Sequence, residues 1–266
     1  MELSALRNKK LFLFDMDGTL YLGDRLFPFT KELLCTIRAM GGRYLFMTNN
    51  SSKSVSAYVS KLARLGISAT EEDFLTSSQA TAFYLRQHHT GKTLYVCGTQ
   101  SLKAELEESG FPISDDIEKT QCIVMGFDTE LTFGKLEAVS KLLCTKELPY
   151  IATNPDYVCP TEFGSVPDCG SVCDMLYNVS GKRPLVIGKP EPLMPYLAME
   201  KWGCTKEETV VIGDRIYTDI KSGINAGVTT VLVLSGETTR QILDKSVDKP
   251  DFVMDDCSQL LNLLKE

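Results

Sequence analysis

Two aspartates, Asp15 and Asp17, stand one residue apart directly after the apolar run Leu11–Phe14. Two like charges at the end of a buried strand are costly unless something cationic lies between them. A hard divalent ion such as Mg²⁺ is usually held by two or three converging carboxylates and by water. The pair therefore predicts a cation-binding site at the end of this strand.

Further polar groups follow other apolar runs in the same way. They are Thr48-Asn49-Asn50, Lys189, and Asp214 with Asp219. In an open parallel sheet, ligands bind beyond the carboxyl ends of the strands, so we expect these groups to meet. A lysine and a hydroxyl beside metal-binding carboxylates suit a phosphoryl group, whose charge must be neutralised during transfer.

Each signal taken alone also has an ordinary interpretation. Asp-x-Asp-Gly occurs in calcium loops, but here it follows an apolar strand and the fuller calcium pattern is absent. Thr-Asn-Asn is commonly a turn, and Gly188-Lys189-Pro190 lacks the spacing of a P-loop. Zinc at Cys169 and Cys173 is a further alternative, although a second ligand pair is missing. Taken together, the four signals are stronger, because each falls at an expected strand end in chain order. They are the Asp15 and Asp17 pair, Thr48-Asn49-Asn50, Lys189, and Asp214 with Asp219.

The elements that must position these groups alternate along the chain. Short apolar runs alternate with amphipathic helical patterns, which predicts an α/β protein with parallel sheets covered by helices. Residues 81–180 form a series of their own, so we expect an α/β unit inserted into a core made of residues 1–80 and 181–266. After the run at 43–48, Ser51 or Ser52 is the expected N-cap of the next helix.

The composition is that of an ordinary globular protein. The 266 residues are 43% hydrophobic and 24% charged, which argues against disorder. A net charge of −7, with no basic run, disfavours a nucleic-acid or membrane-surface partner. No apolar stretch approaches membrane-spanning length, the first ten residues lack a signal-peptide core, and the nine cysteines lack paired spacing. We therefore expect a cytoplasmic protein.

Four segments in this order, "DMDGTL", "TNNS", "GKP" and "GDRIYTDI", resemble the motifs of the haloacid dehalogenase superfamily of phosphohydrolases. The large insert with "ATNPD" resembles the NagD-like and p-nitrophenylphosphatase-like branch. The resemblance covers nearly the whole chain. It implies a Rossmann-like core with an α/β cap, and Mg²⁺-dependent hydrolysis of a small phosphorylated metabolite such as a nucleotide or sugar phosphate.

The resemblance also implies roles for individual residues. Asp15 would be the nucleophile that forms an aspartyl-phosphate, Asp17 the general acid and base, and Thr48 and Lys189 ligands of the phosphoryl group. The expected metal ligands are Asp15, Asp17 through its carbonyl, Asp214, and Asp219 more indirectly. The expected substrate-binding residues are Gly18, Asn49 and Asn50 in the core and Asn154, Pro155 and Asp156 in the cap.

One cap segment departs from the branch. At 166–171 the sequence is "VPDCGS", and Asp168 stands where we expect a residue without a side chain. A phosphomutase or phosphotransferase with the same intermediate remains an alternative function, as does a non-catalytic binding module on the same fold. A homodimer formed through the cap is also left open.

Overall fold

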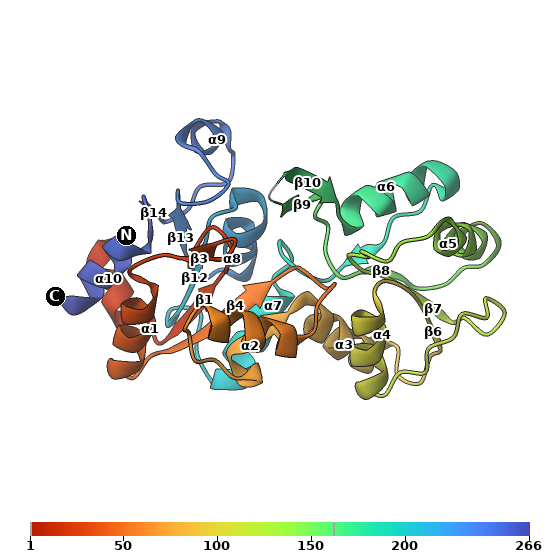
Figure 1. Ribbon diagram of the computed structural model, residues 1–266, viewed down its shortest axis with the longest axis horizontal. Helices are drawn as coiled ribbons and strands as arrows, with labels where there is room; N and C mark the ends of the chain where they lie inside the picture. The colour runs from red at the N-terminus through yellow and green to blue at the C-terminus, as the bar shows by residue number, and fades with distance from the viewer. Residues whose placement is uncertain (1, 162) are drawn as a thin grey trace. The chain divides into compact units, whose positions relative to one another are not determined.

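The structure, a computed structural model, describes residues 2–161 and 163–266 (Figure 1). It contains two compact units that alternate along the chain. The first unit comprises Met1–Thr48, Val59–Leu75 and Lys189–Glu266, and the second comprises Asn49–Tyr58 and Thr76–Gly188. The second unit thus begins before residue 81, ends after residue 180, and includes a short segment near residue 50.

The first unit is built on a six-stranded sheet. Its strands, in spatial order, are β14 (Phe252–Met254), β13 (Thr229–Val233), β12 (Thr209–Gly213), β1 (Leu11–Phe14), β4 (Arg43–Thr48) and β5 (Phe74–Thr76). β1 pairs in parallel with both β12 and β4, and Phe14 lies opposite Ile212 and Phe46. All four side chains of β1 are buried, as expected for a central strand covered on both faces.

Helices of the first unit pack on one another in pairs. α1 packs on α10, and α7 packs on α8. The helical segments are η1 (Leu3–Asn8), α1 (Thr30–Ala39), η2 (Glu71–Asp73), α7 (Leu193–Trp202), η3 (Ile216–Ile220), α8 (Lys221–Ala226), α9 (Arg240–Lys245) and α10 (Cys257–Lys265). A two-stranded hairpin, β2 (Tyr21–Leu22) with β3 (Arg25–Leu26), follows β1. In α1, buried Leu33, Leu34 and Ile37 have the spacing of one helix face.

Helix α2 (Val55–Arg64) shows that the expected N-cap was wrong. The Ser54 hydroxyl, not Ser51 or Ser52, accepts a hydrogen bond from a first-turn N–H, that of Ala57, at 3.3 Å. Ser51 Oγ instead contacts Thr153 Oγ1 at 2.9 Å and accepts from a distant backbone N–H. Ser52 Oγ donates to Asn50, so long-range and turn contacts displace the cap by two or three residues.

The second unit has a four-stranded sheet of its own. Its order is β11 (Leu185–Val186), β8 (Tyr150–Ala152), β7 (Cys122–Met125) and β6 (Leu94–Cys97), with every pairing parallel. β9 (Val158–Thr161) and β10 (Gly164–Pro167) form a separate antiparallel pair. The helices are α3 (Ser77–His88), α4 (Gln100–Glu108), α5 (Phe133–Thr145) and α6 (Cys169–Ser180).

One face of this second sheet packs against α5 and α6. Alternate residues of the strands, such as Ile123 and Met125 of β7, share a buried cluster with Leu142 of α5 and Val172 of α6. This period of two is what a strand buried on a helical layer requires. Both units are therefore parallel α/β structures, which confirms the predicted fold class.

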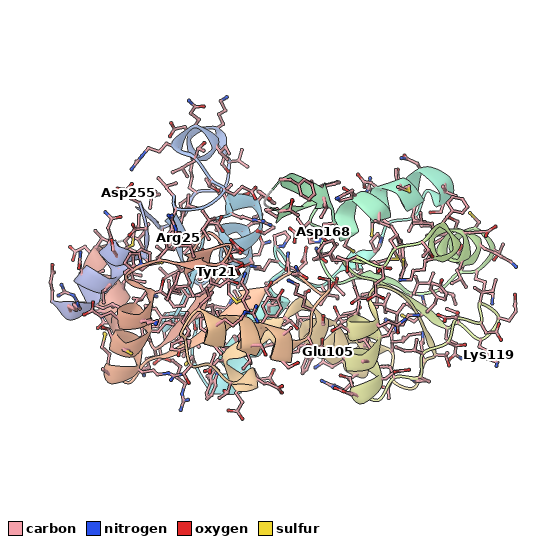
Figure 2. All side chains as sticks on the ribbon, in the orientation of Figure 1. Tyr21, Arg25, Glu105, Lys119, Asp168 and Asp255 are labelled. Carbon is pink, nitrogen blue, oxygen red and sulfur yellow. The ribbon has the colours of Figure 1, made fainter. Side chains whose placement is uncertain are left out.

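Asp168 begins α6 and is labelled in Figure 2. Its carboxylate accepts the N–H of Cys169 as an N-cap, and the helix ends at Gly181 in the left-handed conformation, with φ of +68°. Within the described part of the chain, no helix is long and apolar enough to cross a membrane.

Candidate active site

The carboxyl ends of β1 and β12 bring Asp15 and Asp214 together in the first unit. The register that pairs Phe14 with Ile212 continues through Asp15, whose N–H donates to the Ile212 carbonyl at 2.8 Å. Asp214 follows the last residue of β12. The expectation that parallel strand ends would gather these side chains is met for this pair.

Lys189 is the cationic group of this cluster. Its ammonium lies 2.8 Å from Asp15 Oδ1 and 2.5 Å from Asp219 Oδ1, and it is almost completely buried. Burial lowers the pKa of Lys189, but the carboxylates of Asp15 and Asp219 raise it by more, so its pKa lies above the ordinary value. The side chain therefore stays protonated and contributes a fixed positive charge.

One ammonium leaves the three carboxylates short of positive charge. Burial raises the pKa of Asp15 to about 6, opposed by Lys189 and assisted by Asp219. Burial, and then the charges of Asp15 and Asp219, raise the pKa of Asp214 to about 8. Both pKa values are raised because the ionised carboxylates have too little positive charge near them. A bound divalent cation would supply that charge.

The donor set of Asp15, Asp214 and Asp219 fits a hard cation. One oxygen of each carboxylate lies within 4.8 Å of the others. Among residues 2–161 and 163–266, Asp214 Oδ1 is buried and finds no hydrogen-bond partner. Three neighbouring carboxylates, together with an unsatisfied oxygen on Asp214, match the oxygen-only coordination that Mg²⁺ prefers.

Asp219 is already engaged at both oxygens. Oδ1 accepts from Lys189, and Oδ2 accepts the N–H of Arg215 at 3.0 Å. Gly213 allows this close approach, because a Cβ at that position would lie 2.4 Å from the Asp219 side chain. Asp219 is thus better placed to hold Lys189 and the Asp214 loop than to give both oxygens to an ion.

Asp17 lies apart from this carboxylate cluster. Its Oδ1 accepts the N–H of Gly23 at 3.2 Å, and its Oδ2 lies 3.8 Å from the ammonium of Lys61. Lys61 in turn lies 4.2 Å from the ring centroid of Tyr21. The two neighbouring aspartates therefore point to different partners, since Asp15 faces Lys189 and Asp17, 57% exposed at its side chain, faces Lys61.

Gly18 allows a tight turn after β1. It has φ of +87°, and a Cβ there would lie 2.5 Å from Asp214 Oδ2. A side chain at this position would therefore displace Asp214. Thr48, also predicted for the site, is buried at the end of β4 in the first unit.

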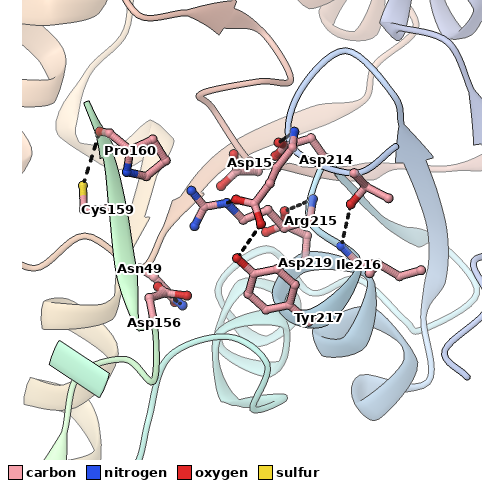
Figure 3. Close-up of polar contacts among 12 residues, drawn as sticks. Asp15, Asn49, Asp156, Cys159, Pro160, Asp214, Arg215, Ile216, Tyr217 and Asp219 are labelled. Carbon is pink, nitrogen blue, oxygen red and sulfur yellow. Dashed lines mark hydrogen bonds and ion pairs between the residues drawn. The ribbon is translucent and has the colours of Figure 1, made fainter. Parts of the chain in front are cut away.

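The remaining predicted residues belong to a polar network of the second unit. Asn49 Nδ2 donates to Asp156 Oδ2 at 2.9 Å, and Asn154 Nδ2 donates to Asp156 Oδ2 and Asp168 Oδ1, each at 3.1 Å. Asn49 and Asp156 are labelled in Figure 3. Asn50 accepts from the N–H and hydroxyl of Ser52. The hydrogen bonds of Asn154 and Asp156 hold the loop that includes Pro155 against Asn49 and the start of α6.

Sequence reasoning missed three residues that contact the predicted aspartates. Lys61 contacts Asp17, while Arg215 and Glu237 lie beside Asp214. Glu237 follows strand β13 in the segment "SGETT", so the strand-end argument could have identified it. Lys61 lies on a helix, where a lysine carries no such signal.

Two family models match the chain. The model for haloacid dehalogenase-like hydrolases matches residues 12–112, and a HAD-hydrolase-like model matches residues 186–260. The two matches include Asp15 and Thr48 in the first and Lys189, Asp214 and Asp219 in the second.

Two relatives are similar to the chain over nearly their full length. 5′-Nucleotidase YutF of Bacillus subtilis is 35% identical over 254 residues, which are 96% of this chain and 98% of the relative. The acid sugar phosphatase of Staphylococcus haemolyticus is 33% identical over 261 residues, 98% of each chain.

Solved structures show the same similarity. A 4-nitrophenylphosphatase from Thermotoga maritima matches with a TM-score of 0.93 and 39% identity, over 98% of this chain and 99% of that one. The glycerol phosphate phosphatase of Mycobacterium tuberculosis, in complex with magnesium, matches with a TM-score of 0.89 and 28% identity, over 98% of this chain and 78% of that one.

Proposed function

Because the chain belongs to the haloacid dehalogenase-like hydrolases and is a phosphatase, we propose that it hydrolyses small phosphomonoesters with Asp15 as nucleophile and Mg²⁺ as cofactor. The observation that carries the proposal is the buried contact of Lys189 with Asp15, beside Asp214 and Asp219. The proposed nucleophile, the ammonium and the candidate metal-binding carboxylates therefore lie together in the first unit.

Asp15 and Asp17 divide the chemistry between them. A carboxylate oxygen of Asp15 attacks phosphorus as the ester P–O bond breaks, and protonated Asp17 gives its proton to the departing oxygen. The product is an aspartyl-phosphate and a free alcohol. Asp17 then takes a proton from water, whose oxygen attacks phosphorus, and the P–O bond to Asp15 breaks to release inorganic phosphate. Both aspartates return to their starting states.

Lys189 and Thr48 act on the phosphoryl group. The Lys189 ammonium holds Asp15 and offsets the negative charge that gathers on the phosphoryl oxygens during transfer. The Thr48 hydroxyl donates a hydrogen bond to one of these oxygens. A fixed ammonium suits this role because its pKa is raised, so it remains charged throughout the cycle.

Asp15, Asp214 and the backbone carbonyl of Asp17 would hold Mg²⁺, with Asp219 acting through Lys189 or a water molecule. When bound, the ion supplies positive charge that stabilises the phosphoryl group as it is transferred. The unsatisfied Asp214 Oδ1 supports this assignment. The engagement of both Asp219 oxygens supports its indirect role.

The substrate class follows from what the relatives share. A 5′-nucleotidase, an acid sugar phosphatase and a glycerol phosphate phosphatase all have names that specify small phosphomonoesters. We assign this chain to nucleotide or sugar phosphates, with selection by the second unit through the loop of Asn154, Pro155 and Asp156.

The test is hydrolysis of 4-nitrophenyl phosphate by the wild type with Mg²⁺, the wild type with EDTA, and Asp15→Asn with Mg²⁺. We expect turnover only in the first, because Asn keeps the shape of the side chain but is a poor nucleophile. Asp244→Asn, at an exposed position on α9, is the matched control and should keep full activity. Full activity of Asp15→Asn would refute the nucleophile, and full activity in EDTA would refute the cofactor.

A further inference from the structure

The loop after β13 lies directly against Asp214. The N–H of Glu237 donates to Asp214 Oδ2 at 2.7 Å, and the N–H of Thr238 donates to the Asp214 carbonyl at 3.2 Å. A Cβ at Gly236 would lie 2.0 Å from Asp214 Oδ2, so only glycine fits there. The backbone of this loop therefore fixes one oxygen of Asp214.

The side chain of Glu237 fixes the loop in turn. Its Oε2 lies 2.9 Å from Nε of Arg215, and its Oε1 accepts the hydroxyl of Tyr217 at 2.7 Å. Figure 3 draws these contacts of Arg215 and Tyr217. Both donors come from the segment that follows Asp214, so Glu237 closes a ring of contacts around this aspartate. We call its contacts with Asp214, Arg215 and Tyr217 the Glu237 clamp.

The clamp leaves Asp214 with one fixed oxygen and one unsatisfied oxygen. Oδ2 is held by the Glu237 N–H, while Oδ1 is buried without a hydrogen-bond partner among the residues that the structure describes. We propose that Glu237 is a positioning residue for the divalent cation, which holds Asp214 so that Oδ1 faces the ion. This inference rests on the proposed function, because it requires that Asp214 bind the metal.

The effect of Glu237 comes from orientation more than from charge. Its carboxylate is paired with the Arg215 guanidinium, so little net negative charge is left to attract a cation. Partners that orient metal ligands commonly change metal affinity 10- to 100-fold when they are removed. A variant that keeps both side-chain contacts but loses the charge should therefore keep most of the affinity.

The experiment is calorimetric titration of Mg²⁺ into metal-free protein without substrate. We expect Glu237→Ala to weaken binding about 10- to 100-fold and Tyr217→Phe, which removes one contact, about 3-fold. Glu237→Gln should stay within about 3-fold of the wild type, because its amide accepts from Arg215 and donates to the Tyr217 oxygen. Glu32→Ala removes a carboxylate paired with Lys265 at the surface and should leave binding unchanged.

Activity gives a second readout, because the Mg²⁺ concentration for half-maximal rate should rise in Glu237→Ala while kcat at saturating Mg²⁺ is retained.

Binding of Mg²⁺ by Glu237→Ala within twofold of the wild-type affinity overturns the inference. So does equal weakening in the Gln and Ala variants, which would assign the effect to charge. If Glu237→Ala does not fold, Tyr217→Phe and Glu237→Gln decide the question. A wild type that binds no Mg²⁺ refutes the cofactor itself, which is a separate outcome.

Discussion

At the scale of single residues, Asp15 and Asp219 share the buried ammonium of Lys189, and the carboxylate of Asp214 lies close to both aspartates. Burial raises the pKa of Asp15 to about 6 and that of Asp214 to about 8. Without a metal, the folded protein therefore holds protons that the unfolded chain releases near pH 4. The cluster should be tolerated as protonated acids at low pH and as metal ligands at high pH.

The first prediction concerns Asp214→Asn in EDTA. Because the folded pKa lies above the unfolded value, stability is lost as pH rises from about 4 to 8. Removing this ionisable group should therefore make the variant gain stability relative to the wild type between pH 4.5 and pH 8, by several kcal/mol and at most about 5. Urea unfolding at the two pH values measures the difference.

Added Mg²⁺ should reverse that difference. The wild type gains stability by binding the ion, while Asp214→Asn gains little because it lacks a charged ligand. The exposed Asp244→Asn should follow the wild type in both conditions. Equal Mg²⁺ stabilisation of the wild type and Asp214→Asn would show that Asp214 does not bind the ion.

At the scale of elements, the start of α6 and the loop of Asn154, Pro155 and Asp156 form one structure. Asp168 caps the helix and accepts the Asn154 amide, while a Cβ at Gly170 would lie 2.2 Å from the Pro155 carbonyl oxygen. The departure at Asp168 therefore adds a side chain that ties the helix to this loop.

The second prediction is that Asp168→Ala destabilises the second unit by about 1–3 kcal/mol. It removes the cap of α6 and leaves the buried amide of Asn154 with one acceptor fewer. Asp256→Ala is the comparison, because Asp256 caps α10 through the N–H of Ser258 alone. The Asp256→Ala variant should lose about 1 kcal/mol of unfolding free energy. Urea unfolding followed by circular dichroism measures both, and an equal cost would mean that the Asn154 contact contributes nothing.

Local pattern predicted the strands well and some helix starts poorly. β1 and β12 were readable because apolar runs ended in polar groups, and parallel pairing follows from the alternation with helices. The cap of α2 was not readable, because Ser51 bonds to Thr153, about a hundred residues along the chain. The Lys61 contact with Asp17 is likewise tertiary. The sequence thus indicated that Asp15 and Asp214 meet at strand ends. It did not indicate that Asp17, Asn49 and Asn50 have other partners, or which side chains orient the aspartates.

At the scale of the whole molecule, β1 lies between β4 and β12, and the first unit is interrupted by the second. Two of the three clustered carboxylates, Asp214 and Asp219, come from residues after the interruption. The second unit has its own sheet and buried cluster in residues before 189. All residues of the second unit therefore precede β12 in the chain, so this unit can form its internal contacts without β12.

The third prediction concerns a chain of residues 1–208. It lacks β12, so β1 has only β4 beside it, and hydrogen exchange should be fast in β1 and β4. β6, β7 and β8 should keep their protection, and Mg²⁺ should not stabilise the fragment. Exchange measured by mass spectrometry, with the full chain as control, gives both answers. Strong protection of β1 in the fragment would show that the first unit folds without its C-terminal strands.

The central place of β1 also has a consequence for synthesis. Ribosomes add about 5–20 residues per second, so the roughly 200 residues between β1 and β12 take about 10–40 s to emerge. Throughout that time one edge of an entirely apolar strand has no neighbour, long after the second unit could have folded. We expect the nascent chain to be prone to aggregation during this interval. A chaperone that binds apolar strands would bind β1 at this stage.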